Sequence, residues 1–250
     1  MALPSTSALA PRASGSLFLD ALPAHTFERL SEHLERVALR SGDVVAPPNV
    51  PIAHVYFPIG SVISTITRMS DGTAVEAALT GREGMVGAWL ALHQRTSSQE
   101  SVVQIADSAW RMNAGQFLRE LRTDAPLNDA LLRLTHAGII MAGQFIACNR
   151  LHEIQERYAR WLLMAHDRVH NDHFFLTQEY AGQMLGVRRV SVTLVAGEFA
   201  RAGLISYHRG DVAILNRHGL EEIACECYAA VNDTMQDLLG YTIRKGAPAA

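Results

Sequence analysis

The hydrophobic positions of residues 176–215 follow a helical period and then an alternating one, which predicts two short helices and a β-hairpin. Thr177 can cap a helix beginning at Gln178, because its hydroxyl can accept from an unpaired amide of the first turn. Gly186 can end that helix, since glycine adopts the left-handed conformation without a Cβ penalty. A second helix is expected from about Arg189 to Ala202.

The second helix has one apolar face and one mixed face. Val192, Val195 and Phe199 recur at helical spacing and are expected in the core. The opposite face is free to enter a major groove of DNA, and it carries Arg189, Val190, Thr193 and Leu194. Residues 205–215 then alternate around Arg209-Gly210-Asp211, as the hairpin of a winged helix-turn-helix does.

Basic residues gather in this segment. Residues 176–218 contain five arginines and three acidic residues, a net charge of +2, whereas the whole chain carries −3 and the remainder therefore −5. A small structural domain without a nucleic-acid partner could contain the same elements. However, Arg188, Arg189, His208 and Arg209 cluster where phosphates or bases would be met, so the pattern favours DNA binding.

The first half of the chain is expected to form an antiparallel barrel or jelly roll. Residues 17–37 indicate one or two amphipathic helices, with Phe27, Leu30, Leu34 and Val37 on one face. From residue 39 onward, β-favouring runs alternate with turns, among them Asp71-Gly72, which predicts a tight hairpin. The runs cover residues 54–67, 74–80, 102–106 and 110–112, and a loop or short helix at 81–87 interrupts them.

A long helix is predicted from about Pro126 to His152. Its apolar residues follow steps of four and three, the heptad pattern by which two helices pair. We expect this seam to form a homodimer interface; the alternative is a helix packed on its own barrel. The seam consists of Leu127, Leu131, Leu134, Gly138, Met141, Phe145, Cys148 and His152. A second helix, residues 154–169, leads into the winged helix-turn-helix.

The composition is that of an ordinary globular protein, with 48% hydrophobic and 19% charged residues among 250. No uninterrupted apolar run reaches the roughly 20 residues that span a bilayer, so no membrane partner is expected. Three cysteines argue against a disulfide framework and for the reducing cytoplasm. The expected division is a disordered tail (1–16), a β-roll sensor domain (17–123), a dimerisation helix with a linker helix (124–170) and a winged helix-turn-helix DNA-binding domain (171–250).

In the order and size of these parts, the chain resembles the Crp/Fnr superfamily of bacterial transcription regulators from Leu17 to about Tyr228. The resemblance implies an α+β fold: an N-terminal antiparallel β-roll or jelly roll like that of cyclic-nucleotide-binding domains, a long dimerisation helix and a C-terminal winged helix-turn-helix. It also implies a cytoplasmic homodimer that binds a palindromic operator in double-stranded DNA. An activator of this kind would contact RNA polymerase as well. The likeness is strongest at Thr177, Gly182, Gln183, Gly186, Arg189 and Gly203-Leu204-Ile205.

By position, the resemblance implies that Thr177, Arg188, Ser191 and His208 contact phosphates. It places Arg189 where an arginine reads a base, for which bidentate donation to guanine is suited. Val190 and Leu194 stand at reading positions where relatives often have glutamate and arginine, so a different DNA target is expected. The predicted DNA-binding set is Thr177, Arg188, Arg189, Val190, Ser191, Thr193, Leu194, His208 and Arg209.

Cyclic-nucleotide binding in this family needs a Gly-Glu-Leu loop and an Arg-Ser or Arg-Thr pair, which hold the ribose and neutralise the cyclic phosphate. Here the loop reads Gly87-Ala88-Trp89, and Gln99 or Glu100 stands where the arginine is expected. A glutamate there would repel phosphate, so cyclic AMP is not the expected effector. An effector pocket for another ligand would use Arg82, Gly87, Ala88, Arg95 and Ser101.

The cysteines and histidines predict no metal and no other cofactor. The first 147 residues contain no cysteine, which excludes the N-terminal iron–sulfur cluster of some family members. Cys225 and Cys227, expected on one helix, would point to different faces. Cys148 would pack as a small apolar residue or form a disulfide with its copy in the dimer. His166, His170 and His173 have helical spacing but no accompanying H-E-x-x-H motif.

The sequence therefore predicts a DNA-binding regulator that is not gated by cyclic AMP. An enzyme is not expected, since neither a Gly-rich phosphate loop nor a nucleophile elbow occurs. Three alternatives stay open. They are a sensor gated by another nucleotide through Arg82 and Arg95 or by a redox signal, a barrel metalloenzyme with an appended helical module, and a protein-interaction module whose winged helix does not bind DNA.

Overall fold

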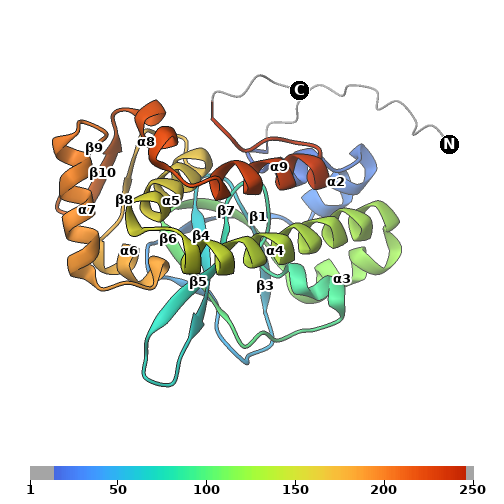
Figure 1. Ribbon diagram of the computed structural model, residues 1–250. Helices are drawn as coiled ribbons and strands as arrows, with labels where there is room; N and C mark the ends of the chain where they lie inside the picture. The colour runs from blue at the N-terminus through green and yellow to red at the C-terminus, as the bar shows by residue number, and fades with distance from the viewer. Residues whose placement is uncertain (1–13, 246–250) are drawn as a thin grey trace.

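The computed structural model describes residues 14–245, in which a β-roll and a winged helix-turn-helix domain are joined by two helices (Figure 1). Residues 1–13 of the predicted disordered tail lie outside the described residues. Residues 14–16 contradict that prediction, because they pack on the β-roll. Ser16 is fully buried, and the Trp110 indole Nε1 donates to the Ser14 carbonyl at 3.0 Å.

The β-roll consists of two antiparallel sheets, with strand orders β1-β7-β3 and β2-β6-β4-β5. Their inward faces bury side chains such as Val55, Phe57 and Ile63, none of which is exposed to solvent. The predicted antiparallel β-roll is thus confirmed. The strands are β1 (Glu35–Leu39), β2 (Val44–Ala46), β3 (His54–Pro58), β4 (Val62–Arg68), β5 (Ala74–Thr80), β6 (Glu100–Ile105) and β7 (Asp107–Asn113).

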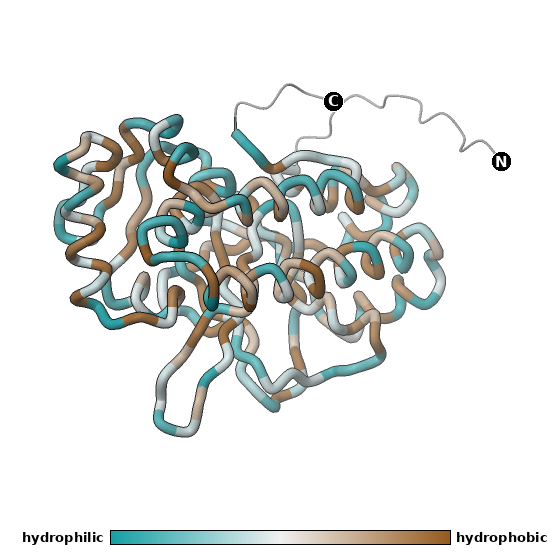
Figure 2. Tube along the Cα trace, viewed as in Figure 1, coloured by the Kyte–Doolittle hydropathy of each residue, from teal (hydrophilic) through white to brown (hydrophobic). Residues whose placement is uncertain are grey.

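The N-terminal helices are shorter than predicted. Helices α1 (Leu17–Asp20) and α2 (Ala24–Ser31) are followed directly by β1, so Leu34 and Val37 are not on a helix face. Val37 pairs with Ala109 of β7, and this long-range pairing overrides the local helical spacing. The hairpin predicted at Asp71-Gly72 does join β4 to β5, with Gly72 at φ 87°. Figure 2 shows this hairpin hydrophobic at its base and hydrophilic at its tip.

The long helix α4 (Ala125–Leu151) follows α3 (Ala114–Thr123). Asp124 caps its N-terminus, because the Asp124 side chain accepts from the Leu127 amide at 2.9 Å. Its predicted seam is wrong as a dimer interface, because the seam is already buried within one chain. One half packs on the β-roll, and the other half packs against α9 (Cys227–Leu239), which lies alongside α4 in Figure 1. The buried seam residues are Leu127, Leu131, Leu134, Met141, Phe145 and Cys148, while Gly138 is half-buried.

A different face of α4 is exposed and apolar. Leu132, Ile139 and Ile146, spaced seven residues apart, are 42%, 64% and 74% exposed. By length and composition alone, α4 could cross a membrane, although the sequence contains no uninterrupted apolar run of that length. Its apolar character follows instead from two hydrophobic faces, one packed inside the protomer and one on its surface.

Helix α5 (Ile154–Arg168) runs through the middle of the molecule and is buried along most of its length. A capping box between Glu153 and Glu156 fixes its start directly after His152, where α4 ends. The histidines predicted at helical spacing separate here. His166 lies on α5 and is 2.8 Å from the Asp172 carboxylate, His170 lies in the following loop, and His173 begins strand β8 (His173–Phe175).

Candidate nucleic-acid interface

The two helices of the helix-turn-helix are fixed at their junction by small residues and caps. Helix α6 (Gln178–Leu185) begins after Thr177, whose Oγ1 accepts from the Tyr180 amide at 3.2 Å, and it ends at Gly186 with φ 63°. A Cβ built at Gly182 would stand 3.0 Å from the Val187 carbonyl, so the turn passes too close for a larger side chain. Helix α7 (Arg189–Arg201) follows. The predicted caps and bounds are confirmed to within one residue.

Helix α7 presents two faces as the sequence predicted. Val192, Val195 and Phe199 are buried in the domain core. Val190 and Leu194 are 67% and 64% exposed, and apolar tips at such positions can contact a thymine methyl group. The exposed side also carries Arg188, Arg189 and Thr193, with Ser191 half-buried.

The wing is a hairpin of β9 (Ile205–His208) and β10 (Asp211–Ile214), with β8 as the third strand of its sheet. Arg209 and Gly210 both have positive φ, 50° and 92°, as the two central residues of a type I′ turn require. A Cβ at Gly210 would lie 2.6 Å from the Phe175 ring, so only glycine fits there. The tight turn leaves His208 and Arg209 exposed at the tip.

Three elements meet in one surface cleft beside α7. The cleft is lined by Thr177 before α6, Arg189 at the start of α7 and Arg209 on the wing, together with Tyr207, whose hydroxyl donates to the Leu176 carbonyl at 3.0 Å. Within residues 14–245, no acidic side chain forms an ion pair with Arg188, Arg189 or Arg209. The structure therefore brings predicted phosphate-contacting and base-reading positions together. Glu179 also lines the cleft but is ion-paired with none of these arginines.

Strand β5 of the β4–β5 hairpin packs against α6 of the helix-turn-helix (Figure 1), a contact that the sequence did not predict. Asp71 and Gly72 of the hairpin line one hollow with Arg188 and Arg189. The same hairpin also touches the turn of the motif, since a Cβ at Gly186 would lie 3.3 Å from the Val75 side chain. Residues more than 100 positions apart meet here, and local spacing carries no signal of such a contact.

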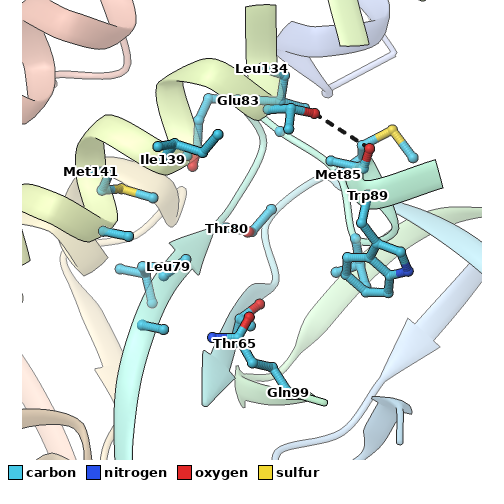
Figure 3. Close-up of a pocket in the computed structure, with 18 of the residues that line it drawn as sticks. Thr65, Leu79, Thr80, Glu83, Met85, Trp89, Gln99, Leu134, Ile139 and Met141 are labelled. Carbon is cyan, nitrogen blue, oxygen red and sulfur yellow. Dashed lines mark hydrogen bonds between the residues drawn. The ribbon is translucent and has the colours of Figure 1, made fainter. Parts of the chain in front are cut away.

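A cavity of about 290 Å³ lies between β5, the turn at residues 80–86 and α4 (Figure 3). Glu83 enters it from the turn, but its carboxylate is ion-paired with the buried Arg168 at 2.9 Å. Met235 reaches the cavity from α9. The remaining wall is mostly apolar, with Leu79, Met85, Trp89, Leu134, Ile139 and Met141 and the polar Thr65, Thr80 and Gln99.

The structure does not bring the predicted effector residues together. Ala88 lines the cavity, whereas Arg95 lines a separate hollow with His93 and Gln94. Arg82, Gly87 and Ser101 line neither of these two hollows. The backbone at Gly87 requires glycine, because its φ is 102° and a Cβ there would collide with the Val55 side chain.

Gln99, and not Glu100, faces the cavity. Glu100 instead pairs with Arg68 at 2.8 Å, so the predicted repulsion of a phosphate by this glutamate does not arise. No arginine is among the residues that line the cavity.

A family model matches the C-terminal part of the chain, and solved structures share the fold of most of it. Residues 156–223 match the Crp-like helix-turn-helix domain family. The structure of a Crp/Fnr-family transcriptional regulator from Eubacterium rectale superposes with a TM-score of 0.63 at 16% identity, covering 84% of this chain and 98% of that one. The structure of FixK2 from Bradyrhizobium japonicum superposes with a TM-score of 0.65 at 15% identity, covering 77% of this chain and 98% of that one. The structure of a Crp/Fnr-family regulator from Thermus thermophilus superposes with a TM-score of 0.61 at 22% identity, covering 76% of this chain and 98% of that one. None of the curated proteins matches the sequence.

Proposed function

Because the chain has the fold of the Crp/Fnr transcriptional regulators and its residues 156–223 are a Crp-like helix-turn-helix domain, we propose that it is a homodimeric, sequence-specific DNA-binding regulator of the cytoplasm. The observation that carries the proposal is the cleft in which Thr177, Arg189 and Arg209 converge from three elements. Unpaired guanidinium groups in such a cleft suit phosphate oxygens and guanine edges. The three free thiols suit a reducing compartment.

Direct readout would rest on few side chains. Arg189 would donate to a guanine, and the exposed Val190 and Leu194 would make only apolar contacts. Arg188, Ser191, His208 and Arg209 would hold the phosphate backbone. Thr193 donates to the Gln178 side chain at 2.6 Å, so it would serve to fix α6 against α7 as well as to face the groove.

The homodimer is proposed on the exposed face of α4 and not on the seam predicted from the sequence. Leu132, Ile139 and Ile146 recur every seven residues, and Gly143 lies between the last two, where a Cβ would meet nothing within 4 Å. A heptad line of this kind is completed by a second copy of the same helix. Two such helices would place two copies of α7 for successive major grooves of a palindromic operator.

Regulation by cyclic AMP is not part of the proposal. The cavity beside α4 lacks an arginine for the cyclic phosphate, and its one carboxylate, Glu83, is already engaged by Arg168. A second candidate function is gating by a small apolar ligand. It is favoured because Gly138 and Ile139 of α4 line the cavity, so an occupant would touch the proposed dimer line directly.

The test is selection and sequencing of DNA retained by the purified full chain at moderate salt, without added ligand. We expect recovery of a palindrome whose half-sites lie about one helical turn apart. Retention of DNA only at low salt and without sequence enrichment would contradict sequence-specific binding by the free protein. Titration with cyclic AMP should leave the melting temperature unchanged, and a clear rise would overturn the exclusion of that ligand.

A further inference from the structure

Four side chains that the proposed function does not use meet at the corner where α4 turns into α5. They are Cys148 and His152 from the end of α4, and Cys225 and Cys227 from the connection between α8 (Arg217–Ile223) and α9. Their three sulfur atoms and one imidazole nitrogen all lie within 4.8 Å of one another. All three cysteines are buried, and His152 closes the cluster toward solvent.

The local structure explains why the thiols converge. Cys148 lies in the last turn of α4, and His152, four residues later, caps the C-terminal end of that helix, so the two side chains lie close together. Cys225 lies in the connection before α9, outside any helix, and Cys227 is the first residue of that helix. The prediction that these two cysteines share a helix and point to different faces is therefore wrong. The alternative of a disulfide between two copies of Cys148 is contradicted as well, since this residue is fully buried against Cys225.

Two of the separations between donor atoms are close to those of a tetrahedral metal site. Cys148 Sγ is 3.5 Å from Cys225 Sγ, and Cys227 Sγ is 3.6 Å from His152 Nδ1. Ligands at zinc distances in a tetrahedron stand about 3.8 Å apart for two sulfurs and about 3.6 Å for sulfur and nitrogen. We propose that Cys148, His152, Cys225 and Cys227 bind one Zn²⁺ ion as a closed Cys₃His structural site.

The surroundings supply the outer contacts of such a site. His152 Nε2 is 3.0 Å from a carboxylate oxygen of Glu226, which leaves Nδ1 as the metal-facing nitrogen. Gln144 Nε2 donates to Cys227 Sγ at 3.0 Å. The carboxylate–histidine pair orients the ring and raises its basicity, as it does in known zinc sites.

Positive charge nearby favours the thiolates that a metal needs. Arg157 and Arg160 are buried next to the cluster, and Nε of each lacks a hydrogen-bond partner among the described residues. Three thiolates, a neutral imidazole and Zn²⁺ sum to −1, which these guanidinium groups can balance. Each thiol that binds the ion releases its proton to solvent.

The chemistry of the four donors selects among metals. Thiolate and imidazole at tetrahedral spacing suit Zn²⁺, whereas Mg²⁺ and Ca²⁺ prefer oxygen ligands. An iron–sulfur cluster would place several iron and sulfide atoms between the cysteines and so needs wider spacing than these atoms have. With all four positions filled by protein, the site has no open position for catalysis. It would fasten α9 to the corner between α4 and α5.

The test begins with untagged full-length protein purified under reducing conditions without chelator. Metal analysis should find about one Zn²⁺ per chain. Displacement by Co²⁺ should give the visible absorption of tetrahedral Co²⁺ together with a thiolate-to-cobalt charge-transfer band. Removing the zinc with a strong chelator should lower the melting temperature, and returning Zn²⁺ should restore it.

Variants make the assignment specific. Cys225→Ser should abolish stoichiometric zinc, whereas His136→Ala, which removes an exposed histidine of the same helix as Cys148, should retain it. His152→Cys should still bind Co²⁺, with a stronger charge-transfer band because four thiolates replace three. This variant keeps the test meaningful even if Cys225→Ser does not fold.

Two results would overturn the proposal. One is reduced wild-type protein that carries no zinc and gives no tetrahedral Co²⁺ spectrum at equimolar metal. The other is a disulfide between Cys148 and Cys225 in protein prepared without oxygen. Neither readout involves DNA, so failure of the zinc site and failure of the proposed DNA binding would be seen separately.

Discussion

The Trp161 indole Nε1 donates to the Glu76 carboxylate at 3.1 Å, which ties α5 to strand β5 in the interior of the molecule. Ser64 Oγ donates to the other carboxylate oxygen at 2.6 Å. Burial raises the pKa of Glu76 to about 7, against its ordinary value of 4.5. The folded state therefore holds this proton more tightly than the unfolded chain, and stability should fall as the pH rises from about 4.5 through about 7.

Glu76→Gln should remove that pH dependence. Above pH 7 the variant is expected to be more stable than the wild type by an amount of the order of 2–3 kcal/mol, because it buries no charge. Near pH 4.5 the two should be similar. Urea unfolding at several pH values measures the difference, with the exposed Glu28→Gln as the control. Parallel pH profiles for Glu76→Gln and the wild type would show that Glu76 does not titrate in this range.

The buried pair of Glu83 and Arg168 should be sensitive to loss of either partner. Arg168 Nε donates to Glu83 Oε1 at 2.9 Å, and Nη1 donates to the Met164 carbonyl at 2.8 Å. Arg168→Met leaves a buried carboxylate without its cation and is expected to cost about 3–5 kcal/mol. Adding Glu83→Gln should recover part of that loss. A double-mutant cycle by denaturant unfolding measures the coupling, and strictly additive effects would mean that the two charges do not interact.

Arg189 should carry sequence preference, whereas Arg209 should carry affinity. Arg189→Ala is expected to weaken binding to the selected operator by about 1–3 kcal/mol and to relax specificity at one base pair. Arg209→Ala should weaken binding to all sequences and reduce the salt slope by about one. Arg201→Ala, at the other end of α7, is the matched control. Fluorescence anisotropy with specific and scrambled DNA separates these effects; equal losses on both DNAs for Arg189→Ala would make it a phosphate contact.

The exposed line of α4 should control the oligomeric state. Ile139→Asp with Ile146→Asp places charges on the proposed seam and should give monomers by sedimentation velocity. Ala147→Asp adds a charge to the neighbouring exposed position and should leave the dimer intact. Dissociation by the control, or a dimer that survives the double variant, would place the interface elsewhere.

Local signals accounted for the elements that the sequence predicted well. A hydroxyl at Thr177, glycines at Gly186 and Gly210 and the apolar spacing of Val192, Val195 and Phe199 each act within a few residues of themselves. Such constraints hold whatever the rest of the chain does. The prediction that Val37 lies on a helix was wrong because Val37 pairs with Ala109 of β7, and a residue so distant in the sequence leaves no local signal.

The interface and the metal cluster could not be predicted for a related reason. Apolar residues spaced three and four apart show that α4 packs against another element, but not whether that element is α4 of a second copy or α9 of the same chain. The four candidate ligands combine two pairs that are more than 70 residues apart. Each pair alone is a weak signal, and only the packing of α9 on α4 unites them.

That packing also sets an order of events during synthesis. The seam of α4 is completed by α9, the last helix among the described residues, and Met235 of α9 forms part of the wall of the cavity in the β-roll. The β-roll can therefore begin to fold on the ribosome, but the far half of α4 stays uncovered until residues 227–239 have left the exit tunnel. A chain stalled before that point would display two apolar faces of α4 in place of one.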